Sequence, residues 1–188
     1  MSKILRQIVN MALSEDIGTG DLSSSLLDDN VTSAKIICRE KAIICGIDYS
    51  DLCFSTLDSD IEIDWKIKEG KEATPGTVIC NLKGKSQAII SAERTALNFL
   101  QTLSATATQT KHLVDMIKHT NAKLLDTRKT IPNMRYAQKH AVKCGGGVNH
   151  RMGLFDCVLL KENHILSIGS LKKSIEKALD EYPDKPVI

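Results

Sequence analysis

Helical patterns and short apolar runs alternate along the second half of the chain, and this alternation constrains the fold more than any other feature. Apolar residues recur at helical spacing over residues 92–103 and 113–117, on either side of a Thr- and Ala-rich joint at 104–108. The pattern then predicts a strand at 122–126, a helix at 133–143, a strand at 156–160, a helix at 170–182 and the start of a strand at 186–188. Such alternation indicates right-handed βαβ units, and therefore a parallel sheet or barrel.

The first half of the chain predicts a small α+β module. An N-terminal helix is expected to pack through one apolar face, formed by Ile4, Leu5, Ile8, Met11 and Ala12. A turn at residues 18–21 follows it. Strand-like alternation at 34–39 and 61–67 is interrupted by a helix at 46–57, and turns are expected at 69–70, 75–76 and 83–84.

The predicted strands of the second half are too few to close a barrel by themselves. Residues 186–188 read as a strand that has only begun. We therefore expect either that the sequence is a fragment or that partner material completes the fold.

Composition excludes several classes of protein. The net charge is only +2, and no run approaches the 18 apolar residues of a membrane-spanning helix. The N-terminus lacks the uninterrupted apolar centre of a signal peptide. The six cysteines form no CxxC pair and lie mostly in apolar runs, so we expect free, buried thiols, a cytoplasmic chain and no zinc site.

Positive charge is concentrated in one window of the sequence. Residues 123–164 hold eight Lys and Arg against three Asp and Glu, whereas residues 1–122 hold 13 against 16. A nucleic-acid-binding module would need aromatic residues among these cations, and the window offers only Tyr136 and Phe155. We therefore expect no nucleic-acid partner.

The cations of this window follow the predicted strands directly. Arg128 and Lys129 come after Asp126-Thr127, Lys161 comes after the apolar run 157–160, and His150-Arg151 follows three glycines at 145–147. Arginine matches a carboxylate or phosphate with two parallel hydrogen bonds, and lysine adds a compact charge. Cations at neighbouring strand ends predict a site for a small molecule with several negative groups.

Other interpretations of the same residues remain open. The cations could be a solvated basic face, and His150 could be structural. The three glycines could hold a phosphate or merely turn the chain. Asp126 and Asp156 are expected to orient the cations, and His164 to cap a helix or pack. The remaining histidines are expected to be inert at the surface: His112, His119 and His140.

Four segments closely resemble the quinolinate phosphoribosyltransferase family: AERTALNFL (92–100), LLDTRKT (124–130), GGGVNHRMGLFD (145–156) and VLLKENH (158–164). EDIGTGDLSS (15–24) and LSATAT (103–108) agree with that family, so the resemblance covers the chain from about residue 5 to its end. It implies an α/β protein with an open α/β sandwich domain at 1–104. Residues 105–188 would be the first part of an incomplete, seven-stranded TIM-like barrel.

The resemblance also implies an activity. Quinolinate would attack phosphoribosyl pyrophosphate and lose a carboxylate, giving nicotinate mononucleotide, pyrophosphate and carbon dioxide in NAD biosynthesis. The implied roles are catalysis by Lys129 and Lys161, which also bind substrate, and substrate binding by the following residues: Arg94, Thr127, Arg128, His150 and Arg151. Arg94 would act in the barrel site of a partner subunit, so a homodimer or higher homo-oligomer is expected.

Two departures and one difference in length accompany the resemblance. Ala105 stands where the family usually has glycine, and Ile131 where threonine is common. Family members extend well beyond 188 residues, and the further part would carry glycine loops for the phosphate and acidic groups for the ribose and for Mg²⁺. The alternatives are a related enzyme with another anionic acceptor and a non-catalytic anion-binding protein.

Overall fold

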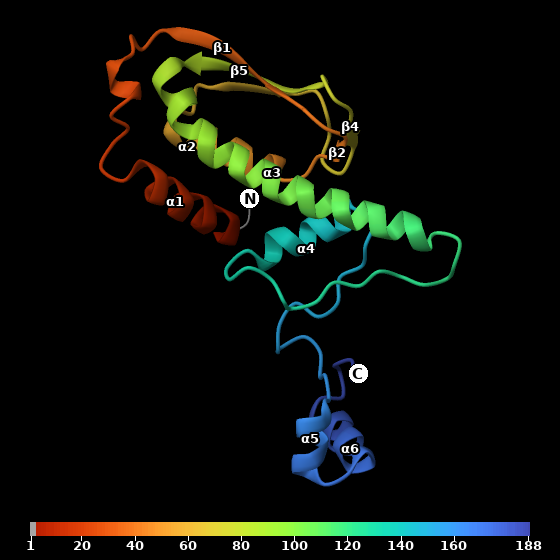
Figure 1. Cartoon of the computed structure of the whole chain (residues 1–188). Helices are drawn as coiled ribbons and strands as arrows, with labels where there is room; N and C mark the ends of the chain where they lie inside the picture. The colour runs from red at the N-terminus through yellow and green to blue at the C-terminus, as the bar shows by residue number, and fades with distance from the viewer. Residues whose placement is uncertain (1–2) are drawn as a thin grey trace.

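The computed structural model describes residues 3–188 and places a layered N-terminal half above an extended C-terminal half (Figure 1). In the N-terminal half, strands cover helices, and the long helix α3 runs along the base of this layer. Helix α4 lies beneath α3, and from there the chain runs in extended segments to a pair of short helices, α5 and α6. The elements, in order, are α1 (Lys3–Ile17), η1 (Ser24–Leu26), β1 (Val31–Ile37), β2 (Ala42–Ile43), α2 (Ile47–Leu57), β3 (Glu62–Trp65), β4 (Glu72–Ala73), β5 (Val78–Lys85), α3 (Ser86–Ile117), α4 (Arg135–Cys144), α5 (Glu162–Ile168) and α6 (Leu171–Glu181).

An antiparallel sheet of three strands in the order β1-β5-β3 forms the outer layer. Val31 pairs with Lys85 at one end of β1, and a register shift between Ile36 and Ile37 interrupts the other end. Strands β2 and β4 form a separate antiparallel pair. The predicted α+β module is therefore confirmed, and so is its internal helix, which begins one residue after the predicted start.

The turn expected at residues 83–84 is wrong, because both residues lie inside β5. Gly84 is there for a packing reason. A Cβ atom at this position would lie 2.8 Å from Cγ1 of Ile61, so the strand accepts only glycine without moving its neighbour. The turns at 69–70 and 75–76 are present, with Gly70 and Gly76 in the left-handed region.

Helices α1, α2 and α3 bury their apolar faces under the sheet in one core. The face that α1 buries is centred on Leu5, Val9 and Leu13. This corrects the predicted face, since the side chains of Ile4 and Met11 are 37% and 64% exposed. The three buried residues are spaced at i and i+4, so the helical period was right while the centre of the face was displaced.

Helix α3 is continuous over 32 residues, so the predicted break at the Thr- and Ala-rich joint is wrong. Small side chains in the joint let neighbouring segments approach the helix closely. Ser104 Oγ accepts a hydrogen bond from Cys45 N at 2.9 Å and donates one to Cys45 O at 3.2 Å. Thr108 Oγ1 accepts from Ile43 N at 2.8 Å. The small polar residues of this segment are therefore explained by hydrogen bonds between α3 and the chain at residues 43–45. They do not mark the end of a helix.

The C-terminal half contains parallel pairings that are shorter than the strands predicted from sequence. One bridge joins Leu125 to Val148 and another joins Val158 to Val187, both parallel. The extended segment at Val148 was not predicted, and neither was α5. The predicted helices at 133–143 and 170–182 are confirmed as α4 and α6.

The parallel bridges and the intervening helices confirm the predicted α/β class. Over residues 3–188 the strands form no closed barrel. Within the same range, no helix is long and apolar enough to cross a membrane.

Candidate active site

Two parallel segments end side by side and bring four of the predicted cationic residues to one edge. Val148 N donates to Leu124 O at 2.9 Å, and Asp126 N donates to Val148 O at 3.1 Å. Because carboxyl ends of parallel strands meet at the same edge, Arg128 and Lys129 follow one segment where His150 and Arg151 follow the other. We call this edge the cationic edge and define it by these four residues.

A buried ion pair supports the cationic edge from below. Lys139 of α4 forms an ion pair with Asp126, and the two side chains are 1% and 7% exposed. The same Lys139 Nζ donates to His150 O at 3.0 Å, and Asp126 Oδ1 accepts from His150 N at 2.8 Å. Asp126 therefore orients the backbone of His150 directly, in agreement with its expected role, and Lys139 holds the carbonyl of the same residue. Lys139 itself was not predicted.

Arg128 presents an unpaired donor at the cationic edge. Its side chain is half-buried, and its Nε atom is buried without a hydrogen-bond partner among the described residues. A buried N–H without an acceptor is costly, so a negatively charged ligand group at this position would be stabilised by it. Lys129 is exposed beside it, and its backbone N donates to Thr127 Oγ1 at 3.0 Å. The Thr127 hydroxyl therefore helps to shape the turn that carries both cations.

The segment after His150 is held by a carboxylate. Asp156 accepts hydrogen bonds from Met152 N at 2.7 Å and from Gly153 N at 3.0 Å. These backbone donors lower the pKa of Asp156 below its usual 3.8. Arg151 Nη1 donates to Cys157 O at 3.2 Å. Asp156 thus stabilises the loop that leads from the cationic edge to the next extended segment.

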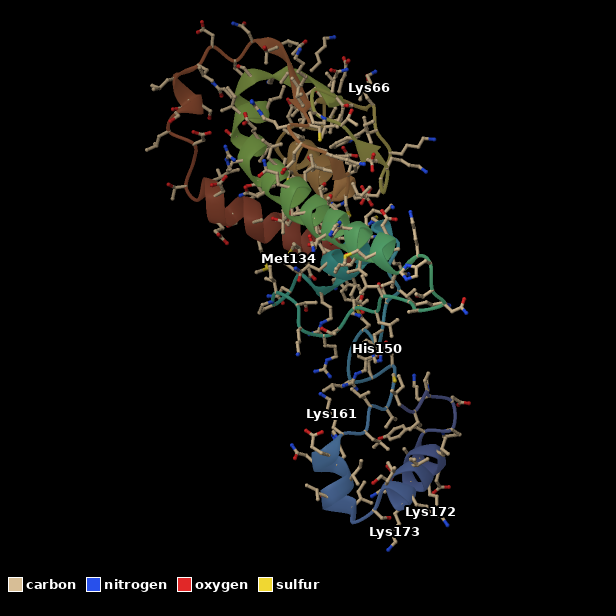
Figure 2. All side chains as sticks on the ribbon, turned by 45° about the vertical axis from the view of Figure 1, so that its right-hand side comes forward. Lys66, Met134, His150, Lys161, Lys172 and Lys173 are labelled. Carbon is tan, nitrogen blue, oxygen red and sulfur yellow. The ribbon has the colours of Figure 1, made fainter. Side chains whose placement is uncertain are left out.

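Lys161 lies on a third segment, at the start of α5. Figure 2 shows it farther along the extended connection than His150, toward the C-terminal helices. Its side chain is exposed, and its backbone N donates to His164 Nδ1 at 3.1 Å, so His164 caps α5 as one of its two expected roles. No backbone bridge within 3–188 joins this segment to Val148. The structure therefore places Lys161 outside the paired segments of the cationic edge.

Arg94 lies on the exposed surface of α3, within the N-terminal half. In the described part of the chain it forms no salt bridge, not even with its neighbour Glu93. With a rise of about 1.5 Å per residue, the rest of α3 places Arg94 about 35 Å along the helix from its C-terminal end. Among the described residues, no hydrogen bond or ion pair joins Arg94 to the cationic edge of the same chain.

The three glycines serve packing where α4 meets α3. A Cβ atom at Gly145 would lie 2.3 Å from Ala107 O, and one at Gly147 would lie 2.7 Å from Val142 Cγ1. Gly146 adopts a φ of 89°. Of the two interpretations of this sequence, the structure favours the turn over a phosphate cradle.

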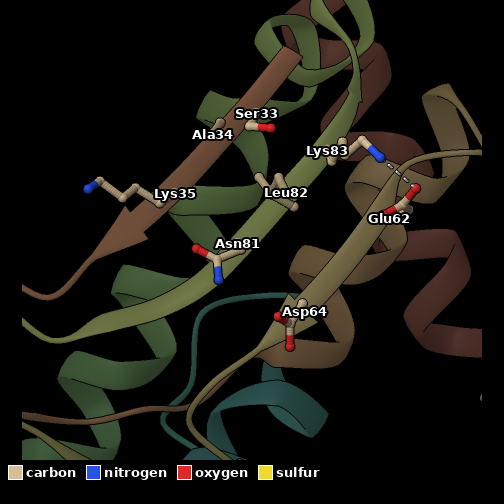
Figure 3. A pocket seen from close by; sticks show the side chains of 8 residues that line it. All are labelled: Ser33, Ala34, Lys35, Glu62, Asp64, Asn81, Leu82 and Lys83. Carbon is tan, nitrogen blue, oxygen red and sulfur yellow. Dashed lines mark hydrogen bonds and ion pairs between the residues drawn. The ribbon is translucent and has the colours of Figure 1, made fainter. Parts of the chain in front are cut away.

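Two surface hollows lie away from the cationic edge. One of about 450 Å³ lies on the outer face of the sheet, where Lys83 and Glu62 pair at 3.3 Å and Asp64 faces the same side (Figure 3). Its charges largely neutralise one another. Another, of about 780 Å³, lies between β1 and α3. Neither hollow is lined by a residue of the cationic edge. The functional argument for the edge therefore rests on its charged side chains and not on a pocket.

A cluster that the sequence analysis missed lies between the two halves of the chain. His140 Nε2 lies 2.9 Å from a carboxylate oxygen of Glu69 and 3.4 Å from Cys144 Sγ. The hydrogen bond with Glu69 raises the pKa of His140, although burial opposes the shift. His140 was expected to be inert. The spacing of His140 and Cys144, one helical turn apart, was the available signal.

Two sequence models of one family match the chain in succession. The model for the "Quinolinate phosphoribosyl transferase, N-terminal domain" matches residues 21–104, and the model for the C-terminal domain matches 106–188. The nicotinate-nucleotide pyrophosphorylase of Ehrlichia chaffeensis is 30% identical, with a TM-score of 0.91, and the alignment covers 98% of this chain and 68% of that one. The chain belongs to the quinolinate phosphoribosyltransferase family. The predicted family and fold class are therefore confirmed.

Further relatives support this membership. The nicotinate-nucleotide pyrophosphorylase of Francisella tularensis is 47% identical with a TM-score of 0.96, over 98% of this chain and 66% of that one. The "Probable nicotinate-nucleotide pyrophosphorylase [carboxylating]" of Bacillus subtilis is 39% identical over 93% of this chain and 61% of its own length. The chain spans between half and two thirds of the length of such curated relatives.

Proposed function

We propose that this chain forms part of a quinolinate phosphoribosyltransferase. In this reaction the ring nitrogen of quinolinate attacks C1 of phosphoribosyl pyrophosphate and releases pyrophosphate. The 2-carboxylate then leaves as carbon dioxide, and nicotinate mononucleotide remains. Family membership supports the reaction class, and the unpaired Nε of Arg128 beside His150 and Arg151 is the observation that carries the choice of an anionic acceptor.

The first step requires orientation and charge stabilisation. Arg128, His150 and Arg151 bind the two carboxylates of quinolinate and fix the direction of its ring nitrogen. Lys129 and Lys161, both exposed, face the phosphates and stabilise the negative charge that develops on pyrophosphate as it leaves. Thr127 contributes by holding the backbone of Lys129. No strong base is needed, because the nucleophilic nitrogen carries a lone pair.

The second step follows from the first. Once the ring nitrogen is bonded to ribose it is cationic, and this charge stabilises the electron pair left at C2 when carbon dioxide departs. We assign Lys129 and Lys161 to positions between the two ligands, toward the phosphates; for Lys161, which lies outside the paired segments of the cationic edge, the assignment rests on family membership. These two lysines are therefore the proposed catalytic residues.

Mg²⁺ enters the proposal with phosphoribosyl pyrophosphate. The two carboxylates nearest the cationic edge are already engaged, Asp126 with Lys139 and His150, and Asp156 with two backbone N–H groups. Their lone pairs are poorly available to a hard cation that prefers free carboxylate oxygens. Neither residue is therefore proposed as a magnesium ligand.

The proposed active unit is a homodimer. Arg94 is exposed on α3 and makes no hydrogen bond or ion pair with the cationic edge of its own chain among the described residues, so it is available to the edge of a second copy. A two-fold dimer would carry two such composite sites. A further arginine at the site can bind a second carboxylate, so Arg94 suits a dicarboxylate better than a monocarboxylate.

Calorimetry of the full-length protein with quinolinate and with nicotinate tests which acid it prefers as the acceptor. Nicotinate lacks one carboxylate and leaves a desolvated cation unpaired, which costs roughly 1.5–3 kcal/mol, or about tenfold to a hundredfold in affinity. Arg128→Ala is expected to remove most of this preference. Arg39→Ala, a change at an exposed arginine of the N-terminal half, is the matched control and should preserve it.

Equal affinity for both acids would contradict the assignment and favour a related enzyme with another acceptor. Tight quinolinate binding without product formation from phosphoribosyl pyrophosphate would instead favour a non-catalytic anion-binding protein.

A further inference from the structure

Four potential metal ligands from three separate segments meet between the two halves of the chain. Cys45 follows β2, Glu69 lies in the turn between β3 and β4, and His140 and Cys144 lie on one face of α4. One ligand atom from each residue can be chosen so that all four lie within 4.8 Å of one another. This cluster lies outside the cationic edge and takes no part in the proposed reaction.

Three of the four ligand atoms lie within 4.0 Å of one another, and Cys45 Sγ lies within 4.8 Å of all three. His140 Nε2 lies 2.9 Å from Glu69 Oε1 and 3.4 Å from Cys144 Sγ, and Cys144 Sγ lies 4.0 Å from the same Glu69 oxygen. Distances of this size between donors are close to those around a tetrahedral ion with bonds of about 2.0–2.3 Å. In the structure, hydrogen bonds hold together the same electron-rich atoms that a cation would bridge.

We propose that Cys45, Glu69, His140 and Cys144 form a structural zinc site. Two sulfur ligands, one imidazole and one carboxylate are a set that borderline-soft Zn²⁺ accepts, whereas Mg²⁺ and Ca²⁺ prefer oxygen alone. Four protein ligands also complete a tetrahedral shell, and this closed shell is typical of structural sites. Zinc would displace the thiol protons and the proton between His140 and Glu69.

Surrounding groups hold the ligands in place. Glu69 accepts hydrogen bonds from Gly46 N at 2.9 Å and from Ile47 N at 3.1 Å, which fix its carboxylate at the start of α2. Ser104 bonds to both backbone groups of Cys45. Such outer contacts orient metal ligands before the metal binds.

The site has both a buried wall and an entry path. Cys45 is fully buried, Glu69 and Cys144 are half-buried, and His140 is exposed. An ion could therefore enter past His140 and rest against Cys45. Once bound, it would connect α4 directly to the turns of the N-terminal half, so its effect would be on stability and not on the chemistry at the cationic edge.

Cobalt titration of the full chain tests the site. The protein is purified with reductant, stripped with a chelator and titrated with Co²⁺, whose visible and thiolate charge-transfer absorption reports tetrahedral sulfur coordination. We expect one Co²⁺ per chain and its displacement by Zn²⁺. Cys144→Ser and His140→Gln should each weaken binding by more than the roughly 10–100-fold that loss of an outer contact costs. Cys38→Ser and His112→Gln replace a cysteine and a histidine outside the cluster and should bind as the wild type does.

Thermal melting gives a second measurement that does not depend on the spectrum. Zinc at a hundredfold excess over its Kd should raise Tm by roughly 5–10 °C in the wild type and in both control variants, but not in His140→Gln. His140 is exposed, so this variant is expected to fold even if Cys144→Ser does not. A Co²⁺ spectrum without thiolate bands, or equal zinc affinity in His140→Gln and wild type, overturns the proposal. Because the readouts are metal affinity and Tm, they remain informative whatever the acceptor assay gives.

Discussion

Lys139 is the residue on which the shape of the cationic edge most depends. It is buried, it carries the partner charge for Asp126, and it also contacts the backbone of His150. Removal of one member of a buried ion pair leaves the other charge uncompensated. We expect Lys139→Met to lower the free energy of unfolding by about 3–5 kcal/mol, measured by urea denaturation.

Lys123→Met is the control for this change. Lys123 is exposed in the segment before Leu124, and a substitution there should alter stability by no more than about 0.5 kcal/mol. Equal, small effects of the two substitutions would show that the Lys139 pair does not support the edge.

The contribution of Asp156 to the stability of the folded chain depends on pH. Its pKa in the folded chain is below the usual 3.8, so its contribution to stability is present above pH 3.8 and is lost as the pH falls through the folded value. We expect the stability difference between wild type and Asp156→Asn to be largest near neutral pH and to shrink below pH 3.8. Denaturation curves across this range measure it, and a difference independent of pH would contradict the assigned role.

Sequence reasoning predicted the charged residues of the edge and the role of Asp126, but not the buried Lys139 that pairs with it. Arg128, Lys129, His150 and Arg151 follow apolar runs or glycines, a local pattern that is visible in the letters. Lys139 lies in a helix among other cations, and only the fold shows that it faces inward. Cys45 and Glu69 are distant in sequence from His140, so their meeting depends on how α4 packs.

Among the elements, the junction of α4 with α3 tolerates the least change. A Cβ atom at Gly145 would overlap Ala107 O, so Gly145→Ala should destabilise the chain by about 1–3 kcal/mol or more. Gly146→Ala meets only Val114 at 3.6 Å and bears mainly the backbone cost of a positive φ, about 1–2 kcal/mol. Tm values of both variants measure the contrast, and a milder effect at Gly145 would argue against close packing of the two helices.

The sequence predicted the type of each secondary-structure element better than its first and last residues. Helices α4 and α6 were predicted from the alternation of helical and strand patterns, whereas the short helix α5 was not. The joint in α3 was misread because Ser, Thr and Ala also occur at helix ends. The contacts of Thr108 with Ile43 of β2 and of Ser104 with Cys45, two residues beyond β2, explain their presence. The segment at Val148 is extended because it pairs with Leu125, a tertiary effect without a strong local pattern.

At the scale of the whole molecule, the proposed dimer makes a distinct prediction. Arg94→Ala and Arg128→Ala homodimers should each be nearly inactive. A heterodimer of the two should regain up to about half of wild-type activity, because one of its two composite sites contains neither substitution. Subunit mixing with the full-length protein, followed by an assay of nicotinate mononucleotide formation, measures the regained activity.

Mixing of each variant with itself is the control. If heterodimers form and activity does not return, Arg94 acts within its own chain or only in folding.

Helix α3 also determines how this molecule can be divided. The two family models meet between residues 104 and 106, in the middle of a single helix whose buried Ser104 and Ala107 lie on either side of that point. A domain boundary placed between the two family models would therefore divide a continuous helix, and each part would keep only some of the buried residues of α3. We therefore expect each half, expressed by itself, to be less stable than the same residues within the whole chain, because each would lack part of the helix that its neighbours pack against.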